Sequence, residues 1–282
     1  MRRRTWLLSP MAGWLPSVVH GQSGRLRIGL TAVILADQAA FLSRWADYLG
    51  QRLGVPVSFV TRDQYQVIHD MLASGQLDAA WTCGYPYVRF QPQLELLAIP
   101  VYRGQPLYQA YLIRTTGSSV RRWSDLRGRV VAWSDPLSNS GWLVPQGELA
   151  AAGVRADELG RSFFAHGHRN VAEAVSSGLA QAGAIDGYVW ETMRQQGMAA
   201  ARETEVVWRS EWHAFPPLVA PANRMHPLIP GLRQALLEMP EDDAGRALLK
   251  SLNLDGFSLG KPAQFDSIRQ LALRVPGSGV RP

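Results

Sequence analysis

The sequence predicts a two-lobed α/β fold, and two patterns support this. Short apolar strands alternate with segments in which apolar residues recur at helical spacing, which is typical of α/β layers. A second strand–helix unit, at roughly 115–215, is inserted into a first unit that both ends of the chain build. The chain has 282 residues, of which 46% are apolar and 18% are charged, so it is long enough for two cores. We expect each lobe to be a mainly parallel sheet flanked by helices, and two extended hinge segments to join the lobes beside a cleft.

The first lobe is expected to contain residues 24–112 and 217–282. Its first helix is predicted at 39–53, because apolar side chains recur there at helical spacing until Gly54. The other predicted elements of this lobe are strands at 25–30, 55–60, 77–82, 94–102 and 217–220, and helices at 65–74, 227–239, 243–252 and 265–273.

The second lobe is expected at 113–216. The chain would enter it near 108–114 and leave it near 208–219, and these two crossings are the predicted hinge. Glycines and polar turns separate its apolar runs. The predicted elements are a short helix at 123–128, strands at 129–133, 162–165, 182–186 and 206–208, and helices ending near 152, at 169–177 and from 190.

The first 23 residues have the layout of an export signal. Arg2, Arg3 and Arg4 precede an uncharged, mostly apolar stretch at 5–19, which is the order of a basic n-region and an apolar h-region. Two prolines interrupt this stretch, and it is too short for a membrane span. We therefore expect 1–23 to be a signal peptide and the remaining chain to be periplasmic.

The excess of positive charge does not indicate nucleic-acid binding. The chain has 29 basic and 23 acidic residues, a net charge of +6, and three of the basic residues lie in the expected signal peptide. The other 26 basic residues are interspersed with the acidic ones. No zinc-finger spacing, helix-turn-helix pattern or basic–aromatic repeat accompanies them. The chain has one cysteine, Cys83, so no intrachain disulfide is possible.

The most informative segment is the loop at 134–145. A strand precedes it, a turn with Ser138, Asn139 and Ser140 follows, and Gly141 lies where a helix begins. One of the three polar side chains would cap this helix, whose first N–H groups have no partner within the helix. Hydroxyl donors beside a helix N-terminus suit an oxyanion. An ordinary capped turn explains the same residues equally well.

This loop resembles the signature Asp-Pro-x-Ser-x-Ser-Gly-x-x-x-Pro of the phosphate-, phosphite- and phosphonate-binding proteins of ABC transporters. These are type II periplasmic solute-binding proteins. Three further segments, at 75–81, 166–175 and 178–186, resemble the family in the same order, and together the resemblance covers most of 25–220. The resemblance implies the two-lobed fold of this class and a ligand bound between the lobes.

The resemblance also implies which residues bind the ligand. In the family the hydroxyl loop binds a tetrahedral oxyanion, which places Ser138, Asn139, Ser140 and the Gly141 amide in that role here. The central position, a hydroxyl in the family, is Asn139 in this chain, and an amide has a different reach. His168 matches a family histidine that opens a helix facing the cleft, and an imidazole N–H can donate to an oxyanion.

Three further residues are candidates with open alternatives. Asp186 would bind a protonated ligand, orient the hydroxyl loop or cap the following helix. Cys83 and Tyr85 lie on the loop expected to form the first lobe's side of the cleft. Cys83 is a small buried filler or a soft ligand for arsenic, as in arsenite-sensing relatives. Tyr85 offers its hydroxyl to the ligand or packs at the rim.

Two features narrow the ligand class. Family members that bind aminoalkyl phosphonates need an acid for the ammonium group, but this chain has apolar residues around Phe215 at that place. Glu211 would reach it only with a shifted alignment. His166 and His168 would be part of a metal site, but no third ligand has a suitable spacing. We expect neither a metal nor another cofactor.

The sequence therefore predicts a monomeric binding protein, not an enzyme, that captures a small oxyanion of the phosphate, phosphite or phosphonate type and delivers it to an ABC permease. One alternative is a periplasmic sensor-binding protein that binds arsenite through Cys83 and signals to a histidine kinase. Another is an enzyme on the same fold with Ser138, Ser140 or Cys83 as nucleophile near His168. No Gly-x-Ser-x-Gly, Ser-x-x-Lys or HExxH motif supports it.

Overall fold

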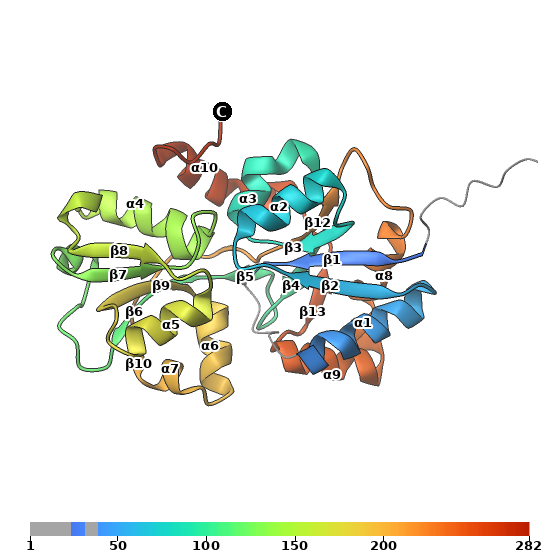
Figure 1. The fold of residues 1–282 in the computed structure, drawn as a ribbon, viewed down its shortest axis with the longest axis horizontal. Coiled ribbons are helices and arrows are strands. Elements are labelled where there is room, and N and C mark those ends of the chain that lie inside the picture. Colours follow the sequence, from blue (N-terminus) through green and yellow to red (C-terminus); the bar gives the residue numbers. More distant parts are fainter. Residues whose placement is uncertain (1–23, 32–38, 282) are drawn as a thin grey trace, which may run out of the picture.

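The computed structural model describes residues 24–31 and 39–281, and it has two lobes, each built on one sheet (Figure 1). The predicted signal peptide at 1–23 lies outside the described residues. The two sheets lie end to end along the long axis of the molecule, and helices cover both faces of each sheet (Figure 1). The predicted two-lobed α/β fold is thereby confirmed.

The first lobe has a sheet with the strand order β13-β4-β12-β3-β1-β2 within the described residues. Its strands are β1 (Leu26–Leu30), β2 (Val57–Thr61), β3 (Ala79–Trp81), β4 (Leu94–Val101), β12 (Leu218–Pro221) and β13 (Gly256–Ser258). Its helices are α1 (Ala39–Leu53), α2 (Tyr65–Ser74), α3 (Gly84–Phe90), α8 (Ile229–Leu237), α9 (Asp243–Leu252) and α10 (Asp266–Arg274).

The second lobe has a sheet with the strand order β10-β6-β9-β7-β8. Its strands are β6 (Ala110–Thr115), β7 (Val130–Trp133), β8 (Arg161–Phe164), β9 (Ala182–Asp186) and β10 (Thr204–Arg209). Its helices are α4 (Val144–Ala151), α5 (His168–Ser176), α6 (Gly187–Gln195) and α7 (Ala199–Arg202).

Both sheets are mixed, whereas the sequence pattern predicted mainly parallel ones. In the first lobe, β1 pairs in parallel with β2 and β3, but β12 lies antiparallel between β3 and β4. The reason is the path of the chain. Because β12 follows the return from the second lobe, it enters the first sheet from the hinge and runs against its neighbours.

The hinge consists of two short strands that cross between the lobes. They are β5 (Leu107–Tyr108) and β11 (His213–Ala214), which pair antiparallel with Tyr108 opposite His213. β11 lies within the crossing predicted near 208–219, and β5 ends at the start of the one predicted near 108–114. The exact domain boundaries stay a prediction, and α10 contacts α3 of the first lobe as well as α4 of the second.

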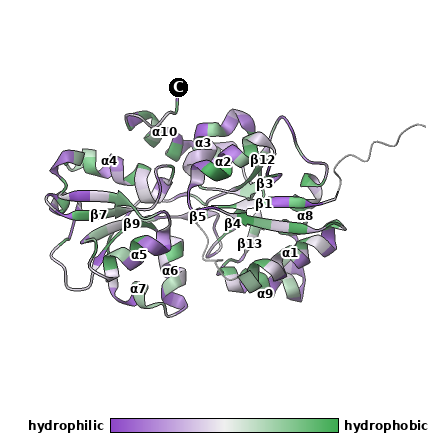
Figure 2. Cartoon of the chain, in the orientation of Figure 1, coloured by the Kyte–Doolittle hydropathy of each residue, from purple (hydrophilic) through white to green (hydrophobic). Residues whose placement is uncertain are grey.

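Each lobe is stabilised by apolar layers between its sheet and its helices. On α1 the residues at helical spacing face the sheet, and Trp45 stacks on Phe59 and meets Trp81 edge-on. In Figure 2 the strands are largely green and the outer faces of the helices carry the purple residues. Among the described residues, no helix combines the length and the apolar character that a membrane span requires.

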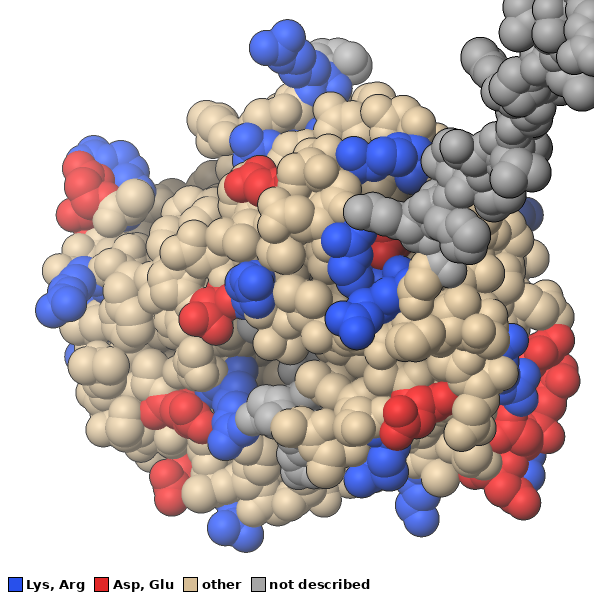
Figure 3. All heavy atoms as spheres, turned by 45° about the vertical axis from the view of Figure 1, so that its right-hand side comes forward, with Lys and Arg blue, Asp and Glu red and all other residues tan. Residues whose placement is uncertain are grey.

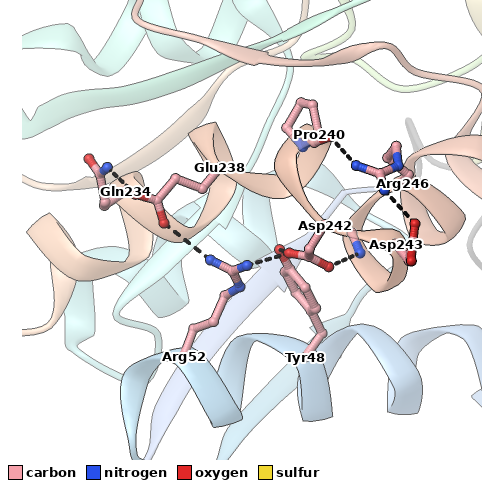
Figure 4. Close-up of polar contacts among 9 residues, drawn as sticks. Tyr48, Arg52, Gln234, Glu238, Pro240, Asp242, Asp243 and Arg246 are labelled. Carbon is pink, nitrogen blue, oxygen red and sulfur yellow. Dashed lines mark hydrogen bonds and ion pairs between the residues drawn. The ribbon is translucent and has the colours of Figure 1, made fainter.

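Polar side chains also tie helices of the first lobe together at its surface (Figure 4). Tyr48 donates to the Asp242 carboxylate at 2.9 Å, and Arg52 pairs with Glu238 and Asp242. These contacts join α1 to the start of α9 and the end of α8. Partly exposed ion pairs of this kind contribute little each, so the apolar layer beneath them carries most of the stability. Elsewhere on the face shown in Figure 3, basic and acidic groups are interspersed.

Candidate functional site

The loop after β7 enters the space between the lobes and forms one wall of the candidate site. Ser138 has an extended backbone and caps a π-helical turn at Asn139–Leu143, with its Oγ accepting from the Gly141 N–H at 2.9 Å. Helices with π turns often occur at functional sites. Ser138, Asn139 and Ser140 are completely buried. The strand end thus places a row of polar side chains in the interior of the molecule.

Several polar atoms in this wall have no hydrogen-bond partner. A buried polar atom without a partner costs about 1–3 kcal/mol, so such a group indicates a place for a polar ligand. The unpartnered buried atoms of the second lobe in this region are Ser134 Oγ, Asn139 Oδ1, Ser140 Oγ, His166 Nδ1 and Asp186 Oδ2.

His168 opens α5 and has a defined protonation state. Its Nδ1 lies 3.1 Å from the Asp186 backbone N–H, which can only donate, so Nδ1 is the acceptor and Nε2 carries the proton. Burial lowers the pKa of His168 to about 3, so the ring is neutral at pH 7. Nε2 lies 3.4 Å from the Tyr65 hydroxyl of the first lobe. His168 is therefore a neutral N–H donor between the lobes.

Asp186 lies at the end of β9 and combines a structural bond with a free oxygen. Its Oδ1 accepts from the Tyr188 N–H at 2.8 Å and thereby caps α6. Its Oδ2 is buried without a partner. Burial raises the pKa of Asp186 to about 8, against the effect of backbone N–H groups that favour the charged form. The free oxygen can therefore share a proton with a ligand.

The first lobe and the hinge close the site with two phenols and a thiol. Cys83 Sγ accepts from the Asn139 N–H at 3.2 Å, and Tyr108 on β5 accepts from Asn139 Nδ2 at 2.9 Å. Tyr65 at the start of α2 approaches His168 as described above. Burial raises the pKa of Cys83 to about 11, so it is a neutral thiol at pH 7. All three side chains are buried.

The donors of the site are uncharged. Among the described residues, Arg114 is the one lysine or arginine that is buried, and it pairs with Glu205 and bonds two carbonyl groups at 118 and 120. Within 24–31 and 39–281, no three His, Cys, Asp or Glu side chains are grouped so that they could hold a metal ion. The arrangement fits an oxyanion that hydrogen bonds, rather than a positive charge, would hold.

An aromatic group adjoins the polar wall. Phe215 is fully buried, and its ring centroid lies 4.9 Å from that of Tyr188, 5.8 Å from Tyr108 and 6.3 Å from Tyr102. The resemblance implied that the carboxylate of aminophosphonate-binding family members is replaced by the apolar residues around Phe215. Glu211, the possible substitute, is exposed to solvent. This side of the site is therefore aromatic and lacks a carboxylate, and of these rings Tyr102 carries a buried hydroxyl without a hydrogen-bond partner.

The structure brings most of the candidate residues together in one buried cluster. The exceptions are the Tyr85 hydroxyl, which lies elsewhere, and the Gly141 amide, which already has a partner. Ser138, Asn139, Ser140, His168, Asp186 and Cys83 all belong to the buried cluster. The Tyr85 hydroxyl instead donates to the Ser278 carbonyl at 2.6 Å, beside a groove between α4 and the C-terminal segment. The Gly141 amide is occupied by Ser138.

Gly141 also has a different role from the one the sequence suggested. The expectation was that the missing side chain lets a ligand approach the backbone. In the structure a Cβ at this position would collide with the Ser134 hydroxyl, so the glycine makes room for Ser134. Its carbonyl accepts from the Ser134 N–H at 3.3 Å. The glycine is thus needed for the packing of the loop.

Sequence reasoning missed Tyr65, Tyr108, Ser134 and Asp135 as members of the site. Ser134 and Asp135 stand in the motif loop, so their position was a usable signal. Tyr65 and Tyr108 come from a helix start and a hinge strand, and no local motif marks them. Their role depends on contacts across the cleft.

Comparisons with known proteins agree with this architecture. A sequence profile of the family described as "ABC transporter, phosphonate, periplasmic substrate-binding protein" matches residues 30–265. The phosphate-import protein PhnD of Mycolicibacterium smegmatis is 30% identical over 179 residues, which are 58% of this chain and 55% of that protein. The match therefore spans about half the length of that relative.

Two solved structures show the same fold at low identity. A binding protein component of an ABC phosphonate transporter from Pseudomonas aeruginosa has a TM-score of 0.82 and 21% identity, over 89% of this chain and 86% of the other. PhnD1 from Prochlorococcus marinus, solved in complex with methylphosphonate, has a TM-score of 0.79 and 19% identity, over 89% of this chain and 97% of the other.

Proposed function

The chain belongs to the periplasmic substrate-binding proteins of phosphonate ABC transporters, and from this premise we propose that it captures a small, monoprotonated tetrahedral oxyanion and delivers it to an ABC permease. The observation that carries the proposal is the cluster of buried, unpartnered polar atoms between the lobes. A ligand that bonds with these atoms removes the cost of leaving them unpaired. Binding proteins of this kind act by capture and release, without covalent chemistry.

The mixture of donors and acceptors supports a ligand that keeps a proton. The hydroxyls of Ser138 and Ser140 and the His168 Nε2–H can donate to anionic oxygens. Asn139 Oδ1 can only accept, whereas Asp186 Oδ2 donates while its carboxyl is protonated and accepts when it is charged. One proton shared between Asp186 and a ligand oxygen satisfies both groups, whereas without that proton an anion would face the Asp186 carboxylate with like charge.

The aromatic side of the site supports a small, uncharged substituent on the central atom. Phe215, Tyr108 and Tyr188 offer no carboxylate to an ammonium group. A hydrogen or a methyl group on phosphorus suits such a wall, and the relatives named for phosphate import and for methylphosphonate binding take ligands of this size. Phosphite, phosphate and methylphosphonate are therefore the proposed ligand set.

The sensor and enzyme alternatives gain no specific support. The Cys83 thiol is neutral and accepts from the Asn139 N–H, so it is a weaker ligand for arsenite than a thiolate would be, and the chain has no second cysteine. His168 bonds with the Asp186 backbone and approaches Tyr65, and neither group is a candidate nucleophile of the enzyme alternative. The arsenite prediction stays open to the test of Cys83 below.

Calorimetric titration of the purified protein with phosphate, phosphite, methylphosphonate, 2-aminoethylphosphonate and arsenite tests the proposal. We expect at least one of the first three to bind with a dissociation constant of about 10 μM or lower. 2-Aminoethylphosphonate should bind at least about tenfold more weakly, because its aminoethyl group would be buried against the aromatic rings around Phe215, which offer its ammonium group no carboxylate. Ser251→Ala, at an exposed position on α9, is the matched control for serine substitutions in the site. Failure of all three anions to bind would contradict the proposal.

A further inference from the structure

The helix α2 of the first lobe lacks a cap of its own. It begins at Tyr65, and the residue before it, Gln64, has an extended backbone but makes no side-chain bond to the helix. The first N–H groups of a helix have no partner within the helix and carry its positive dipole end. Something outside α2 must therefore satisfy its first turn.

The partner comes from the other lobe. Asp135, in the loop after β7, accepts from the Tyr65 N–H through Oδ2 at 3.1 Å, although 70 residues separate the two positions. The Asp135 side chain is buried, with 2% of the residue exposed. This bond joins a carboxylate of the second lobe to a helix N-terminus of the first, so it spans the space between the lobes.

Each oxygen of Asp135 already accepts one backbone N–H. Its Oδ1 accepts from the Leu137 N–H at 2.7 Å within its own loop, and its Oδ2 is occupied by Tyr65. Asp186 differs, because its Oδ2 is buried without a partner. The two aspartates near the site therefore have different tasks: Asp186 faces the ligand position, whereas Asp135 holds the lobes together.

We propose that Asp135 is a positioning residue that caps α2 across the cleft and thereby favours the closed arrangement of the lobes. The proposal rests on the proposed function, since closure around a ligand is what it regulates. A bond that exists only when the lobes meet lowers the free energy of the closed state and leaves the open state unchanged. Ligand affinity then includes the strength of this bond, although Asp135 does not touch the ligand.

The variant Asp135→Asn tests this directly. An amide keeps one acceptor oxygen, which the neighbouring Leu137 N–H retains, and its NH2 group then faces the Tyr65 N–H. The bond between the lobes is lost while the loop keeps its own. We expect the dissociation constant for the tightest-binding anion to rise about tenfold, mainly through a faster dissociation rate, with the order of preference among anions unchanged. Small-angle X-ray scattering at saturating ligand should show a larger radius of gyration than for the wild type.

A second variant separates the bond between the lobes from fraying of α2. Gln64→Ser gives α2 its own cap on later N–H groups, since Gln64 already has a suitable extended backbone. In the double variant Asp135→Asn, Gln64→Ser the affinity loss should persist, because the Tyr65 N–H still lacks its acceptor. Full recovery of affinity would mean that Asp135 only stabilises the helix locally, which overturns the proposal.

The outcomes of this inference and of the proposed function are distinguishable. If the wild-type protein binds none of the three anions, the proposed function fails. If the wild type binds one of them and Asp135→Asn binds it equally well, with the same radius of gyration, the proposed function stands and the role of Asp135 is refuted.

Discussion

The two walls of the lobe interface differ in how many buried polar atoms they leave without a hydrogen-bond partner. Among the described residues, most such atoms around the site come from the second lobe, from Ser134 to Ser140 and at His166 and Asp186, and the Tyr102 hydroxyl of the first lobe is the exception. The first lobe and the hinge contribute Tyr65, Cys83 and Tyr108, and each of these has a polar neighbour in the second lobe. The second lobe thus has free bonding capacity for a ligand, and the first lobe covers it. A division of this kind predicts unequal effects for substitutions on the two walls.

Asp186→Asn should have the largest effect, because it converts the free acceptor of the second wall into a donor. Asn keeps the cap on α6 through its oxygen, so the fold is preserved. The proton that Asp186 Oδ2 shares with a ligand oxygen, a charge-assisted bond, is replaced by a neutral amide N–H, which we expect to weaken affinity about 10- to 100-fold in calorimetry. Tighter binding would show that the ligand presents a bare anionic oxygen to this atom and would contradict the monoprotonated ligand.

The same variant should change the pH dependence of stability without ligand. The pKa of Asp186 is about 8 in the folded protein and lies near the ordinary 3.8 when unfolded, so between these values the folded state binds more protons. The wild type therefore loses stability as the pH rises from about 4 to about 8, and the contribution is fully present below pH 4. Asp186→Asn removes this loss. In urea titrations, the difference in free energy of unfolding, variant minus wild type, should therefore grow as the pH rises from about 4 to about 8. A difference that stays constant would argue against a buried Asp186 carboxyl with one unpartnered oxygen.

Ser140→Ala should come next. The hydroxyl is buried beside the Tyr108 hydroxyl on the second wall and has no partner of good hydrogen-bond geometry, so it is available to donate to the anion. We expect about a tenfold loss of affinity and only a small fall in melting temperature, because the one polar contact removed within the protein is that with Tyr108. Ser251→Ala should leave affinity unchanged. Equal affinity of Ser140→Ala and the wild type would place the ligand elsewhere than beside the hydroxyl loop.

Cys83→Ser should have a small effect, since it lies on the covering wall. A serine hydroxyl can accept from the Asn139 N–H in place of the thiol, so we expect less than about a threefold change in phosphite or methylphosphonate affinity. Arsenite binding is the discriminating measurement. If the wild type binds arsenite and the variant does not, the thiol is a ligand and the first wall takes part in ligand binding.

Tyr85→Phe should have the smallest effect on binding. Its hydroxyl bonds with the Ser278 carbonyl, away from the cluster, so affinity should not change. Stability should fall by about 1 kcal/mol, because a buried carbonyl loses its donor. A large loss of affinity with unchanged stability would indicate that Tyr85 contacts the ligand, as the sequence suggested.

The sequence alone was sufficient for features that depend on neighbours along the chain. The alternation of strands and helices predicted the two-lobed α/β fold, and the motif at 135–145 predicted a polar loop between a strand and a helix. Both follow from local periodicity and local capping, which short segments encode. The sequence also predicted polar site residues at Ser138, Asn139, Ser140 and Asp186, because each lies at or just after the end of a strand, and the structure buries all four.

Only the tertiary structure decided which atoms of these residues are free. The Gly141 N–H donates to Ser138, three positions away. The Tyr85 hydroxyl donates to the Ser278 carbonyl, which lies 193 positions along the chain. The contact of Tyr65 with Asp135 and the antiparallel course of β12 likewise arise where the chain crosses and returns between the lobes. Such pairings depend on the positions of whole elements in space, and no periodicity within one segment encodes them. Asp135 therefore stands in the sequence as one residue of a motif, and only the folded chain shows that it caps a helix of the opposite lobe.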